Sequence, residues 1–112
     1  MSDEQGPPSV FTDAERAYLT SQRVARIGPA SPTGRPDVAA VRYQLLGDAI
    51  DIGGRVNPAT YKWHNVVRNG RASVTIDDIA SEDAWVVRGI KIYGRADAIE
   101  RPAGQLGVRF EP

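Results

Sequence analysis

The chain has 112 residues, of which 14 are basic and 14 acidic, so its formal net charge at pH 7 is zero. This length predicts one domain, and the balanced charge argues against sequence-independent binding to nucleic acid or to an anionic membrane. Without cysteine and with a single histidine, one chain cannot form disulfides, cysteine-based metal sites or a multi-histidine metal site, so we expect no metal.

Residues 1–10 are acidic and rich in proline, and they lack the pattern of a secretory signal. We expect them to form a disordered leader. No apolar run approaches the roughly 18 residues that a membrane-spanning helix needs. The sequence therefore predicts a soluble cytoplasmic protein.

The first predicted element is a short helix from Thr12 to about Ser21. Thr12 and Glu15 have the three-residue spacing of a capping box, in which each side chain binds the backbone N–H of the other residue. The apolar stripe of this helix is uneven. We therefore expect a packing helix that covers one end of the core.

Three strands are predicted next, over residues 23–30, 37–46 and 49–53. Apolar and polar residues alternate in these segments, and turn sequences rich in glycine, proline and aspartate separate them. In the second strand, Val41 and Tyr43 should face one side of the sheet and Arg42 the other.

A second helix is predicted from Ala59 to about Asn69. Asn57 is suited to the N-cap and Pro58 to the first helical position, and Gly70 supplies a left-handed stop.

Two further strands are predicted over residues 71–77 and 86–99, the second interrupted at Gly89 and Gly94. Residues 78–85 read as a polar connection, and residues 101–112 read as an irregular tail because they contain proline and glycine without periodicity. Five strands joined mostly by short turns favour a small antiparallel barrel. The fold class is therefore mainly β with short helices.

The most informative stretch lies between the third strand and the second helix. A helix N-terminus exposes unpaired N–H groups and attracts anions; here Thr60 adds a hydroxyl and Lys62 a positive charge, with Arg55 in the preceding loop. Gly53 and Gly54 would allow a flat ring to lie against the backbone. The stretch therefore indicates a phosphate site beside a slot for a planar group, or alternatively a glycine turn before an ordinary solvated helix start.

Trp85 is unusual in the polar connection between the last two predicted strands. An aromatic side chain in such a loop often packs across an interface or against a ligand. The neighbouring carboxylates, among them Glu82 and Asp83, are interpreted as a solvated loop rather than as catalytic acids or metal ligands.

Four segments, GRPDVAAVRY, DAIDIGG, PATYKWHNVVRNGRASVTIDDIAS and RGIKIYGRAD, together resemble the pyridoxamine 5′-phosphate oxidase-like split β-barrel superfamily. Within it the chain is most similar to the actinobacterial deazaflavin (coenzyme F-420)-dependent subgroup. The resemblance covers residues 11–100. It implies a split β-barrel domain over that range and a homodimer with a flavin or deazaflavin between the two barrels.

The resemblance also assigns candidate cofactor-binding residues. The phosphate would meet Thr60, Tyr61 and Lys62, where Tyr61 replaces the usual arginine and removes a bidentate donor. The ring contacts and the adjoining loop would fall on Val41, Arg42, Tyr43, Ile52, Gly53, Gly54 and Arg55. No protein residue is assigned a catalytic role, because hydride transfer belongs to the cofactor.

Members of this superfamily normally continue into a last strand that completes the barrel, and we expect that strand to be missing here. The implied function is an oxidoreductase that uses reduced coenzyme F-420 to transfer hydride to an unsaturated small molecule. Two alternatives remain open. One is an FMN-binding oxidase or reductase of the same fold, and the other is a non-catalytic, truncated cofactor-binding member.

Overall fold

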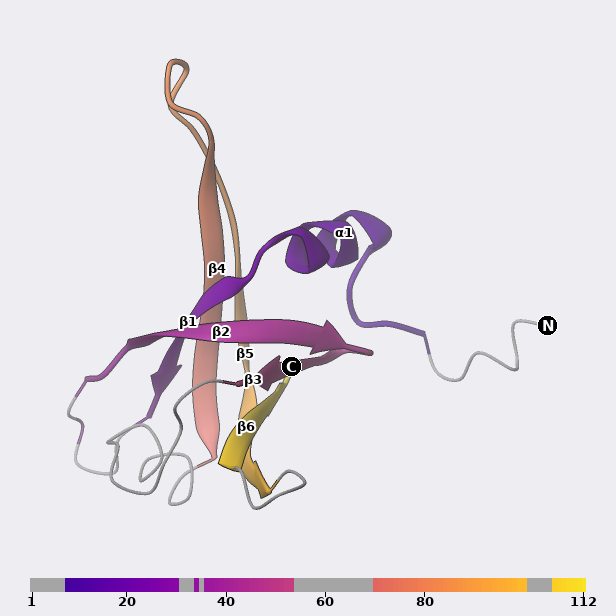
Figure 1. Ribbon diagram of the computed structural model, residues 1–112, viewed down its shortest axis with the longest axis vertical. Helices are drawn as coiled ribbons and strands as arrows, with labels where there is room; N and C mark the ends of the chain where they lie inside the picture. Colours follow the sequence, from indigo (N-terminus) through magenta and orange to yellow (C-terminus); the bar gives the residue numbers. More distant parts are fainter. Residues whose placement is uncertain (1–7, 31–33, 35, 54–69, 101–105) are drawn as a thin grey trace.

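The computed structural model describes residues 8–30, 34, 36–53, 70–100 and 106–112. Within these ranges the chain forms α1 (Asp13–Ser21), β1 (Val24–Pro29), β2 (Ala39–Leu46), β3 (Ala49–Ile52), β4 (Arg71–Ser81), β5 (Val86–Glu100) and β6 (Leu106–Glu111). The strands pair antiparallel in a closed barrel with the neighbour order β1-β2-β3-β6-β5-β4 (Figure 1). The predicted mainly β split-barrel fold is confirmed.

The expectation of a missing last strand is wrong, and so is that of an irregular tail where β6 forms, over Leu106–Glu111; residues 101–105 lie outside the described residues. β6 pairs with β3 on one side, where Ile50 lies opposite Phe110, and with β5 on the other, where Ala96 lies opposite Phe110. Val108 and Phe110 are fully buried while Arg109 between them is exposed. This two-residue alternation is a strand signal, and it is short enough to be obscured by the glycines and proline that precede it.

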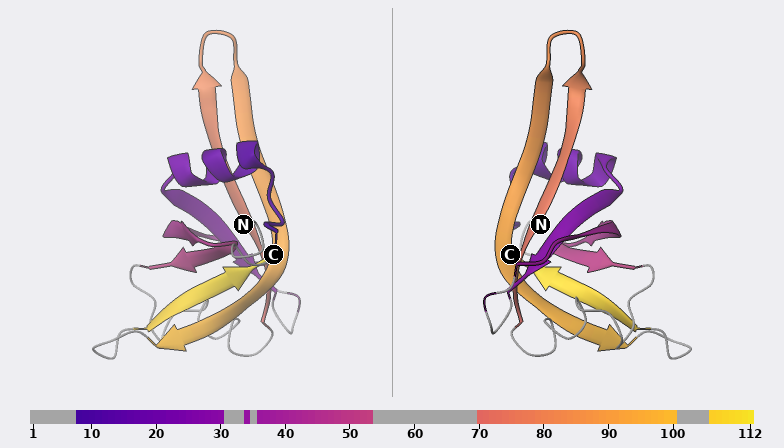
Figure 2. Two further views of the ribbon diagram at one scale, coloured as in Figure 1. Left: turned by 90° about the vertical axis from the view of Figure 1, so that its right-hand side faces the viewer. Right: turned by 90° about the vertical axis from the view of Figure 1, so that its left-hand side faces the viewer.

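Helix α1 begins as the sequence predicts. The Glu15 backbone N–H donates to the Thr12 hydroxyl at 3.1 Å, and the Thr12 N–H donates to the Glu15 carboxylate at 2.8 Å, which completes the capping box. Leu19 is fully buried and packs with the core residues of the strands. The helix lies across the barrel at the base of the β4–β5 hairpin (Figure 2).

The β4–β5 hairpin is longer than predicted and extends past α1, away from the rest of the barrel (Figure 1). The sequence predicts a polar connection over residues 78–85 and interruptions at two glycines. In the structure β4 continues to Ser81, and β5 runs through Gly89 and Gly94 without a break. Asp78 lies directly opposite Arg88. Their ion pair, with 2.6 Å between Arg88 Nη2 and Asp78 Oδ2, explains why polar residues continue the strand there.

The same ion pair attaches the hairpin to the helix. The Tyr18 hydroxyl donates to Asp78 Oδ1 at 2.8 Å, and the Arg88 guanidinium lies 5.3 Å from the centre of the Tyr18 ring. These bonds lower the pKa of the Asp78 carboxyl, with the bond from Arg88 as the largest cause. These contacts therefore hold the hairpin against α1 at the level of Asp78 and Arg88.

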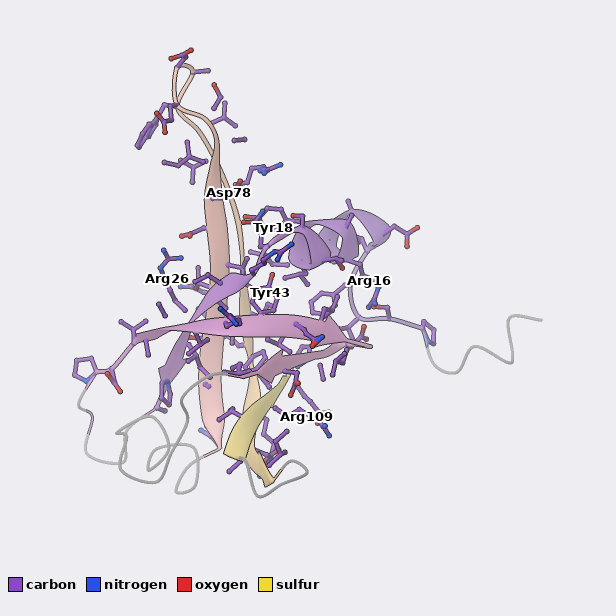
Figure 3. All side chains as sticks on the ribbon, in the orientation of Figure 1. Arg16, Tyr18, Arg26, Tyr43, Asp78 and Arg109 are labelled. Carbon is purple, nitrogen blue, oxygen red and sulfur yellow. The ribbon has the colours of Figure 1, made fainter. Side chains whose placement is uncertain are left out.

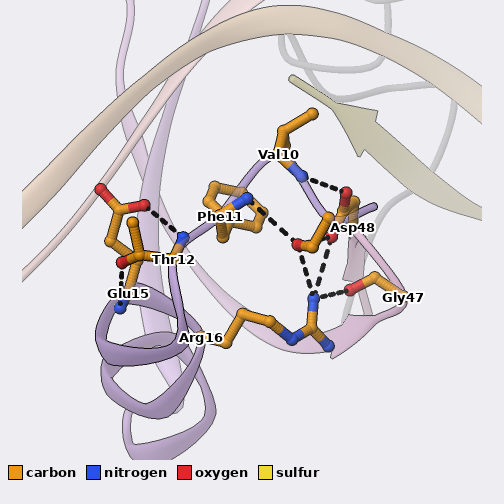
Figure 4. Close-up of polar contacts among 8 residues, drawn as sticks. Val10, Phe11, Thr12, Glu15, Arg16, Gly47 and Asp48 are labelled. Atoms are coloured by element: carbon orange, nitrogen blue, oxygen red, sulfur yellow. Dashed lines mark hydrogen bonds and ion pairs between the residues drawn. The ribbon is translucent and has the colours of Figure 1, made fainter. Parts of the chain in front are cut away.

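The leader is ordered where it is described. The Ser9 hydroxyl and the Val10 N–H donate to the carboxylate of Asp48, in the β2–β3 turn, at 2.6 and 2.8 Å (Figure 4). Arg16 of α1 donates to the same carboxylate at 2.9 Å. The expected disorder is thus wrong for residues 8–10, because Asp48 binds the chain and the helix together; residues 1–7 lie outside the described residues.

The predicted second helix, from Ala59 to about Asn69, also lies outside the described residues, as do residues 31–33, 35 and 101–105. Among the residues that are described, no helix has the length and apolar character needed to cross a membrane.

Candidate functional site

The described part of the chain has an open groove of about 910 Å³ on its surface. It lies where the end of α1 and the start of β1 meet β2 and β3. Its lining residues are Leu19, Thr20, Gln22, Arg23, Val24, Arg42, Tyr43, Gln44, Leu45, Asp51 and Gly53. A groove of this size falls within the range of sites that bind small molecules and cofactors.

Three of the residues proposed from the sequence line this groove: Arg42, Tyr43 and Gly53. Val41 and Ile52 lie next to them in the chain but point into the core, where they are 7% and 0% exposed. Their side chains therefore belong to the core and are not among the described residues that line the groove. The other proposed residues, Gly54, Arg55, Thr60, Tyr61 and Lys62, lie outside the described residues.

Arg42 and Gly53 are the proposed residues that lie on the open side of the groove. The side chain of Arg42 is on the exposed face of β2, and its carbonyl accepts the N–H of Gly53 at 3.1 Å. A Cβ atom built on Gly53 would meet no atom of the described residues within 4 Å, so no described residue fills the space in front of it. Arg42 and Gly53 therefore both border the open space of the groove.

Tyr43 lies between α1 and β2 (Figure 3), where it is 6% exposed. Its hydroxyl donates to the carbonyl of Leu19 at 2.5 Å. Burial raises the pKa of Tyr43 from 10.0 to about 12. This side chain therefore fixes the end of α1 against β2 and keeps its proton near neutral pH.

The raised pKa predicts a loss of stability in alkali. A neutral Tyr43 stabilises the fold fully below pH 10, where the unfolded chain is also neutral, and this contribution disappears as the pH rises from 10 to 12. Tyr18 adds to the same effect, since burial and its bond to Asp78 raise its pKa to about 12. Urea denaturation across this range should show a steeper decline in the free energy of unfolding for the natural chain than for Tyr43→Phe; equal slopes would contradict the assignment.

Arg23 and Asp51 also line the groove, although neither was expected there from the sequence. Arg23 lies between α1 and β1, and its carbonyl accepts the N–H of Tyr43 at 3.1 Å. Asp51 lies opposite Gln44 in the β2–β3 pair and is only 8% exposed. Because Asp51 alternates with Ile50 and Ile52, the sequence predicts that its side chain faces away from the core. The neighbouring sequence does not indicate that the side chain is nevertheless buried.

The groove combines two exposed arginines with one buried carboxylate, so its accessible surface is positive. Such a surface suits a ligand with negative or strongly polarised groups. The described residues contain no cluster of three or more His, Cys, Asp or Glu side chains that could hold a metal ion. The exposed charges that line the groove are therefore those of Arg23 and Arg42.

Residues 11–108 match the family model described as pyridoxamine 5′-phosphate oxidase. The chain is similar to a 5a,11a-dehydrotetracycline/5a,11a-dehydrooxytetracycline reductase of Streptomyces rimosus subsp. rimosus, with 32% identity over 91 residues, which make up 80% of this chain and 64% of the relative. It thus spans a little less than two thirds of that enzyme.

Solved structures share the fold. A conserved hypothetical protein of Mycobacterium tuberculosis superposes with a TM-score of 0.70 at 22% identity, over 90% of this chain and 80% of the other. A FAD-binding protein of Mesorhizobium loti superposes with a TM-score of 0.70 at 16% identity, over 90% and 87%.

Proposed function

Because the chain belongs to the pyridoxamine 5′-phosphate oxidase family, we propose that it is an oxidoreductase that uses a reduced deazaflavin, coenzyme F-420, to transfer hydride to an unsaturated small molecule. The observation that carries the proposal is the open groove in front of Gly53 and beside Arg42. The sequence continues from this point into the segment with Thr60, Tyr61 and Lys62, which we propose binds the phosphate. The similarity to a reductase of dehydrotetracyclines supports the reaction class.

In this proposal the residues of the chain bind and orient the cofactor. When bound, the cofactor supplies the hydride. Arg42 would hold a polar edge of the ring, and Gly53 would allow the ring to approach the backbone. Tyr43 stiffens the floor by its bond to Leu19. We also propose that the protein acts as a cytoplasmic homodimer on a small-molecule substrate.

An FMN-binding oxidase or reductase is the second candidate. The likeness to a FAD-binding protein of the same fold favours an ordinary flavin. The third candidate is a non-catalytic member that binds the cofactor without turning over substrate, favoured by Tyr61 at the position where the family has an arginine.

A fluorescence titration of the purified protein with both cofactors separates these candidates. Binding of coenzyme F-420 with reduction of an unsaturated substrate supports the proposal. Binding of FMN alone supports the second candidate. Binding without turnover of any unsaturated substrate tested supports the third, and absence of binding would remove the groove as a cofactor site.

Lys62→Ala should weaken cofactor binding by at least ~1 kcal/mol, because a charge-assisted bond to the phosphate would be lost. The matched control is Lys91→Ala, which removes the chain's other lysine from the outer face of β5, 5.8 Å from the Tyr93 ring centre. The dissociation constant of each variant for coenzyme F-420 should be measured by the same titration. An unchanged constant for Lys62→Ala would exclude this lysine from the phosphate site.

A further inference from the structure

A second hollow, of about 500 Å³, lies on the outer face of the barrel over β1, β4 and β5. Among the described residues, it shares none of its lining with the groove. Its volume falls within the range of sites that bind small molecules. The lining residues that decide its chemistry are Arg26, Gly28, Asp37, Ser73, Thr75 and Lys91.

The strand register places one hydroxyl between two positive charges in this hollow. Arg26 of β1 lies opposite Thr75 of β4, and Thr75 lies opposite Lys91 of β5. Because neighbouring strands are about 5 Å apart, the backbones of Arg26 and Lys91 are about 10 Å apart with Thr75 between them. Both cations are exposed, and their long side chains can reach one group held above Thr75. A phosphate suits this arrangement, because its oxygens accept bonds from a hydroxyl and from cations at once.

The two cations keep donors for such a group. Arg26 Nη1 donates to Asp77 Oδ1 at 2.7 Å, which engages one of the several N–H donors of the guanidinium. Lys91 takes part in no ion pair among the described residues, and its Nζ lies 5.8 Å from the centre of the Tyr93 ring. Asp37 also lines the hollow, but it forms no ion pair with either cation in the described part of the chain.

The adjoining row of residues offers a second hydroxyl and an aromatic ring. Two residues along from the first row, Gly28 lies opposite Ser73, and Ser73 lies opposite Tyr93. A Cβ atom at Gly28 would lie 3.6 Å from Ser73 Oγ, so glycine keeps the space beside this hydroxyl clear. Tyr93 is 73% exposed. Its ring therefore offers a stacking surface for a planar group next to the two cations.

We propose that this hollow binds a phosphate monoester whose organic part contains a planar ring, as in a nucleoside monophosphate. The phosphate lies above Thr75, between Arg26 and Lys91. The Ser73 hydroxyl donates to the ester, and the planar ring stacks on Tyr93. The inference does not depend on the proposed function, because none of these residues belongs to the groove that is assigned to the cofactor.

Isothermal titration calorimetry of the natural chain with adenosine 5′-monophosphate, inorganic phosphate and adenosine tests the site without any redox cofactor. The monophosphate should bind about tenfold more tightly than either fragment, because it engages both rows of residues. Lys91→Gln and Arg26→Gln should each weaken its binding about tenfold, because each loses a charge-assisted bond. The matched control is Arg109→Gln, an exposed arginine of β6, which pairs with neither β1 nor β4. Figure 3 shows Arg26 and Arg109 on opposite sides of the barrel.

Two further variants distinguish the parts of the site. Tyr93→Ala should lower the affinity for the monophosphate to that for inorganic phosphate, and should leave the affinity for inorganic phosphate unchanged. Lys62→Ala, which is expected to weaken the cofactor, should leave the monophosphate unaffected. Circular dichroism checks that every variant is folded.

Three results would overturn the inference: no binding of the monophosphate, equal binding by the natural chain and Lys91→Gln, or a loss with Lys62→Ala as large as with Lys91→Gln. The last result would place the nucleotide in the cofactor site. Because no deazaflavin or flavin is present, failure of this test is separate from failure of the cofactor titration.

Nuclear magnetic resonance keeps the inference testable if a variant does not fold. In ¹H–¹⁵N spectra of the natural chain, the monophosphate should shift the backbone amide signals of Gly28, Ser73 and Thr75. The amide signal of Gly53, in the groove, should stay in place. Shifts at Gly53 without shifts at the other three positions would contradict the proposed site.

Discussion

Replacing Phe110 with alanine is expected to lower the free energy of unfolding by about 3–5 kcal/mol. The ring is fully buried and belongs to the strand that joins β3 to β5. Its removal takes apolar surface out of the core and leaves a cavity that the closed barrel cannot easily fill. Urea denaturation followed by tryptophan fluorescence measures the change.

The control for this substitution is Arg109→Ala, on the same strand but with an exposed side chain. A change within about 0.5 kcal/mol is expected there. If Phe110→Ala were as harmless as Arg109→Ala, β6 would not be part of the barrel.

Gly94→Ala is expected to destabilise the protein by about 1–3 kcal/mol or more, because it forces an atom into a filled space. A Cβ at this position of β5 would overlap the carbonyl oxygen of Glu111 and lie 2.8 Å from Phe110 Cζ. β6 would have to move away from β5 to admit it. Thermal unfolding measured by circular dichroism should show a clear fall in the melting temperature.

Gly53→Ala provides the comparison, since its added methyl group would meet no atom of the residues that the structure describes within 4 Å. Its melting temperature should stay close to that of the natural chain. A Gly94→Ala variant as stable as Gly53→Ala would mean that β5 and β6 are not in the close contact described.

The sequence predicts the parts of the fold whose signals are local. The Thr12–Glu15 spacing predicts the start of α1, and alternation at Val41 and Tyr43 predicts which face of β2 is buried; both are confirmed. The sequence does not predict the elements that form only because another strand pairs with them. From the sequence alone Asp78 is predicted to be a loop residue, because its ion pair with Arg88 on the opposite strand is not evident. Likewise Phe110 is predicted to belong to a tail, because its pairing with β3 and β5 is visible only in the structure.

The candidate site divides in the same way. Arg42 and Gly53 could be predicted, because a strand that alternates and ends at glycine indicates their positions. Arg23 and Asp51 could not, since they line the groove only where the end of α1 comes down beside β2 and β3. The phosphate-binding role of Thr60, Tyr61 and Lys62 stays a prediction.

Closure of the barrel also constrains how the chain folds. It depends on pairing β1 with β4 and β3 with β6, segments that are far apart in the chain. Such non-local pairings cost loop entropy before they are stabilised, and proteins that depend on them fold in milliseconds to seconds rather than microseconds. A nascent chain holds the β1–β2–β3 meander with one side unpaired until β6 has left the ribosome.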